Sequence, residues 1–93
     1  MINKNILNIR KKLDKLDNRF LDLIKKRTHL VDQVLANKRF KKEIIDNKRI
    51  KKILKEIEKK SRIKNIDTKI TNRIWVNMIR AYIDYEFRSF KKK

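Results

Sequence analysis

Residues 6–40 read ILNIRKKLDKLDNRFLDLIKKRTHLVDQVLANKRF, and this stretch decides the fold. Its apolar residues recur at alternating steps of three and four, which is the spacing of one face of an α-helix. The pattern predicts one long amphipathic helix, from about Asn3 or Asn5 to about Phe40, on the order of 50 Å long at about 1.5 Å per residue. Its apolar stripe consists of Ile6, Ile9, Leu13, Leu16, Phe20 and Leu23, and continues through Leu30, Val31 and Val34.

A second, shorter helix is predicted after a break. The segment 41–45 interrupts the apolar phase, and Asp46 or Asn47 can cap a new helix, because a short polar side chain can accept hydrogen bonds from the first free backbone N–H groups. Its apolar stripe begins at Ile50, and the helix is expected to end near residues 61–64. The sequence therefore places a short helix behind the long one.

A third helix of medium length is expected to begin at Asp67 or Thr68 and to carry apolar residues as far as Phe90. The tail 91–93 is expected to be disordered. The chain contains no Gly and no Pro, so the usual residues for tight turns and helix breaks are missing. We therefore predict an all-α fold of three helices, long, short and medium, forming a single domain over residues 1–93.

The lengths of the predicted helices indicate a dimer. A chain of 93 residues buries only about 60–65% of its unfolded surface when it folds alone, and a long helix projects beyond what so small a domain can cover. The second and third helices together are about as long as the first. Two chains with their first helices side by side could bury every stripe, so we expect an intertwined helical homodimer.

Composition excludes several classes of chemistry. There is no cysteine, which removes disulfides, thiolate catalysis and zinc sites of the cysteine type. We expect no cofactor and no metal. The beginning of the chain has no apolar signal core, and no apolar run is long enough to span a bilayer, so we expect a cytoplasmic protein without a membrane partner.

The formal net charge is +18, which by itself favours a nucleic-acid-binding module. Lys, Ile and Asn are abundant together, as in proteins from AT-rich genomes, and this composition explains part of the charge. Net charge is weak evidence for a specific function. We therefore keep a basic helical nucleic-acid-binding module only as an alternative.

Charged residues stand where the stripes predict apolar ones. Arg27 and Lys38 fall on the apolar face of the first helix, with Arg10 flanking the same stripe. Glu86 falls on the apolar face of the third helix, four residues after Tyr82. A buried, unpaired charge costs several kcal/mol, and one acid cannot neutralise three or four bases. The pattern therefore predicts an anionic ligand.

These charged residues also have a distinctive spacing along the three helices. The set comprises Arg10, Arg27, Lys38, an Asp46-x-x-Arg49 segment and an acid or amide at position 86, and the first helix opens with Leu13-Asp14-Lys15-Leu16-Asp17. In this spacing the chain resembles the all-helical class of chorismate mutases. The resemblance extends from Ile6 to about Phe87.

The resemblance implies a domain-entwined homodimer with two equivalent sites for a small dianion. Arg27 and Arg10 of the partner subunit would hold the two carboxylates of chorismate, and Lys38 would donate to its ether oxygen. Glu86 would be the second catalytic group. The other substrate-binding residues that the resemblance implies are Asp46 and Arg49, with apolar walls from Val34, Ile53, Ile79 and Ile83. The rearrangement to prephenate in aromatic amino acid biosynthesis is pericyclic, so it needs no nucleophile or cofactor.

Position 86 is Glu here, where many members of the family have Gln. A glutamate side chain donates a hydrogen bond only when it is protonated. We therefore expect an activity that falls as pH rises and that Glu86→Gln restores at high pH.

Two residues depart from the mutase pattern and leave the substrate open. Ile50 stands where typical mutases have a Glu that recognises the 4-hydroxyl, and Tyr82 stands where they often have Ser. Both substitutions resemble the related isochorismate pyruvate lyases, which form salicylate and pyruvate on the same fold. We keep chorismate rearrangement first and the lyase reaction as the close alternative. A mutase acting on an aminated chorismate analogue, or a degenerate member without efficient turnover, are further alternatives.

Overall fold

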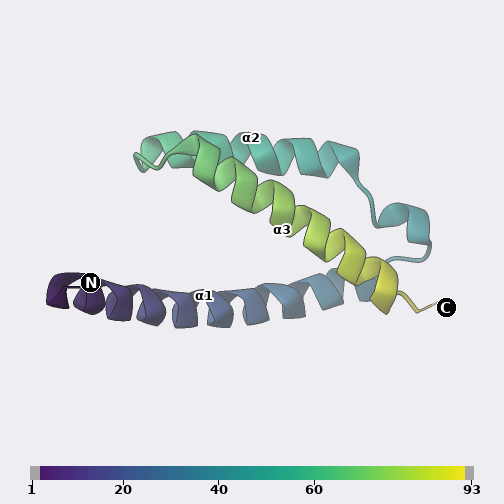
Figure 1. Cartoon of the computed structure of the whole chain (residues 1–93). Coiled ribbons are helices and arrows are strands. Elements are labelled where there is room, and N and C mark those ends of the chain that lie inside the picture. The colour runs from purple at the N-terminus through teal and green to yellow at the C-terminus, as the bar shows by residue number, and fades with distance from the viewer. Residues whose placement is uncertain (1–2, 92–93) are drawn as a thin grey trace. The chain divides into compact units, whose positions relative to one another are not determined.

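The computed structural model describes residues 3–91, and within this range the chain is helical with no strand. The elements are α1 (Lys4–Ala36), a short 3-10 helix η1 (Lys41–Glu43), α2 (Asn47–Ile63) and α3 (Thr68–Ser89) (Figure 1). This confirms the all-α prediction with long, short and medium helices. Packing divides the chain into two compact units, one ending at Gln33 and one beginning at Val34. Of the expected frayed tail, residues 92 and 93 lie outside the described residues.

The first unit is a single amphipathic helix. The side chain of Asn3 begins α1 by accepting the backbone N–H of Ile6 at 2.9 Å, which confirms one of the two predicted starts. The apolar stripe of α1 is exposed except at the half-buried Val31, and its most accessible members, Leu23 and Leu30, are 60% and 59% exposed. An amphipathic helix of this length gains most of its stability from packing its apolar face, so this face requires a cover.

The predicted end of the first helix near Phe40 was wrong, because α1 ends at Ala36. The last turn tightens: the N–H of Asn37 donates to Val34 and that of Lys38 to Leu35, both three residues back at 3.0 Å. Phe40 is extended, with φ −128° and ψ 145°. The apolar pattern alone did not reveal this end, since Val34 carries the stripe into the last turn and Lys38, four residues later, falls on the same helical face.

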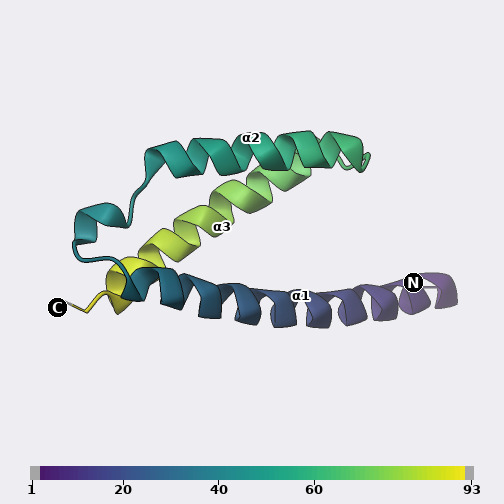
Figure 2. The same cartoon turned by 180° about the vertical axis from the view of Figure 1, so that it is seen from behind.

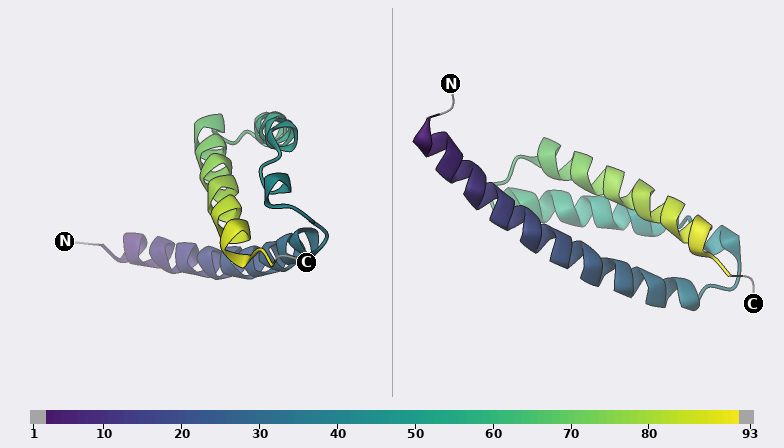
Figure 3. Two further views of the ribbon diagram at one scale, coloured as in Figure 1. Left: turned by 90° about the vertical axis from the view of Figure 1, so that its right-hand side faces the viewer. Right: turned by 60° about the horizontal axis from the view of Figure 1, so that its bottom comes forward.

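The second unit is built on a hairpin of α2 and α3. The two helices meet at their short connecting turn and diverge from it toward their other ends (Figures 1 and 2), as the further views in Figure 3 also show. Asp46 caps α2 by accepting the N–H of Arg49 at 3.0 Å, and Asp67 caps α3 by accepting that of Lys69 at 2.8 Å. Both predicted capping positions are confirmed.

The turn between α2 and α3 is made without glycine. Asn65 has a φ of 58°, the left-handed conformation that glycine usually supplies after a helix. The N–H of Ile66 donates to Ser61 at 2.8 Å and that of Asn65 to Arg62 at 3.1 Å, which is the hydrogen-bond pattern of a Schellman motif. Asparagine tolerates this conformation better than most residues. The turn therefore closes tightly despite the composition of the chain.

A buried pair of hydroxyls joins the two helices beside this turn. Ser61 Oγ lies 2.6 Å from the carbonyl oxygen of Ile57 and 2.8 Å from Thr71 Oγ1. A hydroxyl has one proton, so the shorter contact makes Ser61 the donor to Ile57, and Thr71 then donates to Ser61. Both side chains are thus satisfied at 3% and 8% exposure.

Candidate active site

The two residues that interrupt the predicted stripes most clearly lie together in the second unit. Lys38 Nζ donates to Glu86 Oε1 at 2.9 Å, and the side chains are 18% and 9% exposed. Lys38 follows the end of α1, whereas Glu86 lies in the last turns of α3, 48 residues later. The other ion pairs among the described residues, Glu58–Arg62 and Asp84–Arg88, are local and exposed. An ammonium and a carboxylate therefore share one largely buried position.

The burial of this pair has an electrostatic consequence. A charge removed from water needs compensation, and each member of the pair compensates the other in the ligand-free protein. A ligand that takes a hydrogen bond from Lys38 must share or replace the contact with Glu86. The arrangement can therefore present one cationic donor and one carboxyl group to the same bound oxygen or to neighbouring oxygens.

Lys38 also lines an open hollow of about 430 Å³. The other lining residues are Glu43, Ile45, Asp46 and Asn47, which come from η1 and the start of α2. This places Lys38 and Asp46, two of the predicted site residues, at one hollow. The carboxylate of Asp46 is already used as the α2 cap, so its observed contribution is to fix the start of that helix.

Several further predicted residues lie on α2 and α3 within the same unit. Arg49 and Ile50 lie in the first turn of α2, where Arg49 is exposed and Ile50 half-buried. On α3, Tyr82 precedes Glu86 by four residues, which puts both on one helical face. The Tyr82 ring meets that of Tyr85 edge to face, with centroids 6.3 Å apart. Of the predicted apolar walls, Ile53, Ile79 and Ile83 are half-buried and Val34 is 54% exposed.

The remaining predicted residues, Arg10 and Arg27, belong to α1 in the first unit. Arg10 is exposed and Arg27 is half-buried. They lie 17 residues apart in one continuous helix, which at about 1.5 Å per residue separates them by about 25 Å along its axis. Two arginines so far apart on one helix do not converge on one small molecule.

Sequence reasoning missed the role of Glu43. Its Oε2 accepts the backbone N–H of Phe40 at 2.8 Å and that of Arg39 at 2.6 Å. The bond to Phe40 lowers the pKa of Glu43 from its ordinary value of 4.5, followed by the bond to Arg39 and the charges of Lys38 and Lys42. The available signal was an acid three residues after the N-cap position, here Phe40, because an acid at that position is half of a capping box.

Two classes of site were also sought in the described range. Between residues 3 and 91, no group of three or more His, Cys, Asp or Glu side chains is placed to hold a metal ion. Over the same range, no helix combines the length and apolar character needed to cross a membrane.

A known protein family matches most of this chain. The model of the family "Chorismate mutase type II" matches residues 9–87, which include every predicted site residue. No curated protein and no solved structure gives a significant match. The match covers most of the 93 residues, from the first turns of α1 to the last turns of α3. The chain therefore belongs to the type II chorismate mutase family.

Proposed function

We propose that the protein is a chorismate mutase, which rearranges chorismate to prephenate. The observation that carries the proposal is the buried pair of Lys38 and Glu86 at 2.9 Å, in a chain of this family. In the reaction the ether C–O bond breaks while a C–C bond forms within the same molecule, so no atom or electron leaves the substrate. The protein must hold the compact conformer and stabilise negative charge on the ether oxygen.

Lys38 is the donor to the ether oxygen in this proposal. Its ammonium is held by Glu86 and the Lys38 side chain is only 18% exposed, so the ammonium acts in a partly dehydrated position, where a charge stabilises the transition state more strongly than in water. Glu86 is the second group at that oxygen, and its carboxylate holds the Lys38 ammonium in place. Asp46 and Arg49 support the site from the start of α2.

Each site is completed by two chains. Arg27 and Arg10 of the partner subunit hold the two carboxylates, in the bidentate geometry that guanidinium provides. The separation of about 25 Å along α1 supports this division, because one chain cannot bring both arginines to one substrate. The exposed stripe of α1 supports it too, since a second copy laid along this face would bury it.

A second candidate function is isochorismate pyruvate lyase. Ile50 replaces the acid that typical mutases use for the 4-hydroxyl of chorismate, and Tyr82 lies one turn before Glu86 on the same face of α3. Isochorismate carries its hydroxyl on a different ring carbon, so Ile50 removes a contact to chorismate without harming the isomer. In that reaction a ring hydrogen moves to the enolpyruvyl group as the ether bond breaks, giving salicylate and pyruvate.

The two functions are separated by changing position 50. We expect Ile50→Glu to raise kcat/KM for chorismate and to lower it for isochorismate, because the new carboxylate can accept from the 4-hydroxyl. Ile50→Val is the matched control, since it keeps an apolar side chain at the same position. Steady-state kinetics of both variants with each substrate measure the ratio. A wild-type protein that prefers isochorismate, with Ile50→Glu reversing the preference, would establish the lyase instead.

A further inference from the structure

Hydrogen bonds fix the backbone at Lys38 and at the two residues that follow it. Before it, its own N–H donates to the carbonyl of Leu35 at 3.0 Å in the tightened last turn of α1, and Leu35 is buried. After it, the N–H groups of Arg39 and Phe40 both donate to Glu43 Oε2, at 2.6 and 2.8 Å. No helix continues past Ala36 to satisfy these two groups, so Glu43 replaces the missing helical acceptors.

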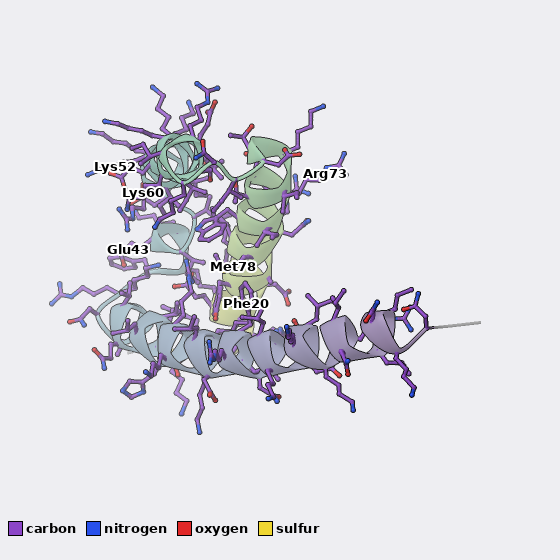
Figure 4. All side chains as sticks on the ribbon, turned by 90° about the vertical axis from the view of Figure 1, so that its left-hand side faces the viewer. Phe20, Glu43, Lys52, Lys60, Arg73 and Met78 are labelled. Carbon is purple, nitrogen blue, oxygen red and sulfur yellow. The ribbon has the colours of Figure 1, made fainter. Side chains whose placement is uncertain are left out.

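Glu43 is itself anchored. It is the last residue of η1, where its N–H donates to Phe40 at 3.0 Å, and the next residue, Ile44, is only 4% exposed. Figure 4 shows the Glu43 side chain at η1, apart from lysines such as Lys52 and Lys60 that project outward from α2. The buried side chain of Ile44, the residue that follows Glu43, fixes the position of the backbone from which the Glu43 carboxylate extends. The loop that carries Lys38 is therefore closed by a short, rigid link.

The Glu43 side chain carries a negative charge at this link. The two backbone donors and the charges of Lys38 and Lys42 lower its pKa, so the side chain is ionised at neutral pH. Glu43 lines the same hollow as Lys38, and a free carboxylate there would repel a dianion. Because Glu43 Oε2 already accepts two backbone N–H groups, we assign this carboxylate to holding the loop and not to contacting the ligand.

We propose that Glu43 is a positioning residue for Lys38: it fixes the two peptide groups that follow Lys38, and so holds the ammonium at Glu86 and over the hollow. The inference rests on the proposed function for its effect on turnover, although the link itself does not. A misplacement of about 1 Å in a catalytic group can reduce turnover by orders of magnitude, so a loosened loop must be visible in the kinetics.

The test uses the full chain and five variants, of which one is a double variant. Glu43→Ala removes the acceptor, Glu43→Gln keeps an oxygen acceptor without the charge, and Glu58→Ala removes an exposed acid of α2 as the matched control. We expect Glu43→Ala to lower kcat/KM on the order of tenfold, Glu43→Gln to recover most of the loss, and Glu58→Ala to match wild type. In a Lys38→Met background, Glu43→Ala should cause no further loss.

Different outcomes overturn different claims. If the wild-type protein is active and the kcat/KM of Glu43→Ala equals that of Glu58→Ala, the positioning role is overturned. It is also overturned if Glu43→Ala lowers kcat/KM by the same factor in the Lys38→Met background as in the wild-type background. A wild-type protein that converts neither chorismate nor isochorismate overturns the proposed function. In that event, the ¹³C chemical shift of the Glu86 carboxyl group decides the positioning role: Glu43→Ala should change it, and an unchanged shift would refute the link.

Discussion

At the scale of single residues, Lys38 and Glu86 form an ion pair at 2.9 Å in a largely buried position. Lys38 and Glu86 were singled out because each interrupts an apolar stripe, and burial explains why such an interruption is informative. Their contact with each other was not predictable, because it depends on where α1 ends and on how α3 packs. Glu43 was missed because the first helix was expected to run to about Phe40, so no helix start was recognised there and the capping-box position of Glu43 went unnoticed.

The Lys38–Glu86 pair should contribute to stability as well as to activity. Lys38→Met leaves a largely buried carboxylate without its ammonium, and we expect a loss of about 1–3 kcal/mol in the free energy of unfolding. Arg88→Met is the control, because its pair with Asp84 is exposed on the same helix and should be worth less than about 1 kcal/mol. Urea titrations followed by circular dichroism compare them, and equal losses would contradict a buried pair.

The same lysine should dominate turnover. We expect Lys38→Met to lower kcat/KM by on the order of 10²–10³-fold, because it removes a charged donor from the breaking ether bond. Steady-state kinetics of wild type and Lys38→Met with chorismate measure this, and an unchanged kcat/KM would refute the role of Lys38.

At the scale of elements, the caps and the three helices were predictable and the connections were not. Asp46 and Asp67 were identified because a capping residue followed by an apolar stripe is a local signal. The end of α1 was misplaced by four residues because the last stripe residue, Val34, lies close to the end of the helix and Phe40 was taken as part of it. Asn65 was not singled out, because the residue that usually marks such a turn is glycine, and the chain has none.

The turn at Asn65 gives a prediction at this scale. Asn65→Ala places a Cβ without a compensating polar group in the left-handed conformation, and should cost about 1 kcal/mol of stability. Asn65→Gly should be neutral or slightly stabilising, because glycine adopts this conformation freely. Thermal melts of the two variants test it. If the alanine variant melted at or above the temperature of the glycine variant, the assignment of this turn would be wrong.

The link at Glu43 gives a pH dependence. Its pKa is lower in the folded chain than its ordinary value of 4.5, so its stabilising effect is complete above about pH 4.5 and is lost as pH falls through the folded-state value. We expect amide exchange at Arg39 and Phe40, corrected for intrinsic rates, to show protection that decreases below pH 4.5. In Glu43→Gln the protection should not change over that range. Identical pH dependence in both proteins would be evidence against the link.

At the scale of the whole molecule, the family and the small amount of buried apolar surface both lead us to expect a homodimer. Among the described residues the buried apolar side chains are Leu35 and Ile44, while the stripe of α1 is exposed. A chain of 11.5 kDa with so little buried apolar surface gains stability from a partner. In the proposed function a second copy of the chain is that partner, and it also provides Arg10 for each site.

The dimer can be tested together with the site. Leu16→Lys puts a charge into the α1 stripe, and we expect it to weaken association and to lower activity in parallel. Asn18→Lys introduces the same residue off the stripe and should leave both unchanged. Sedimentation of wild type should give about twice 11.5 kDa at micromolar concentration. A monomeric wild-type protein with full activity would exclude a site shared between chains.

The most direct measurement is product identification with the purified wild-type protein. The protein is incubated separately with chorismate and with isochorismate, and prephenate, salicylate and pyruvate are quantified against Lys38→Met as the control. The proposed function predicts prephenate from chorismate, formed by wild type and not by the variant. No product from either substrate would contradict it.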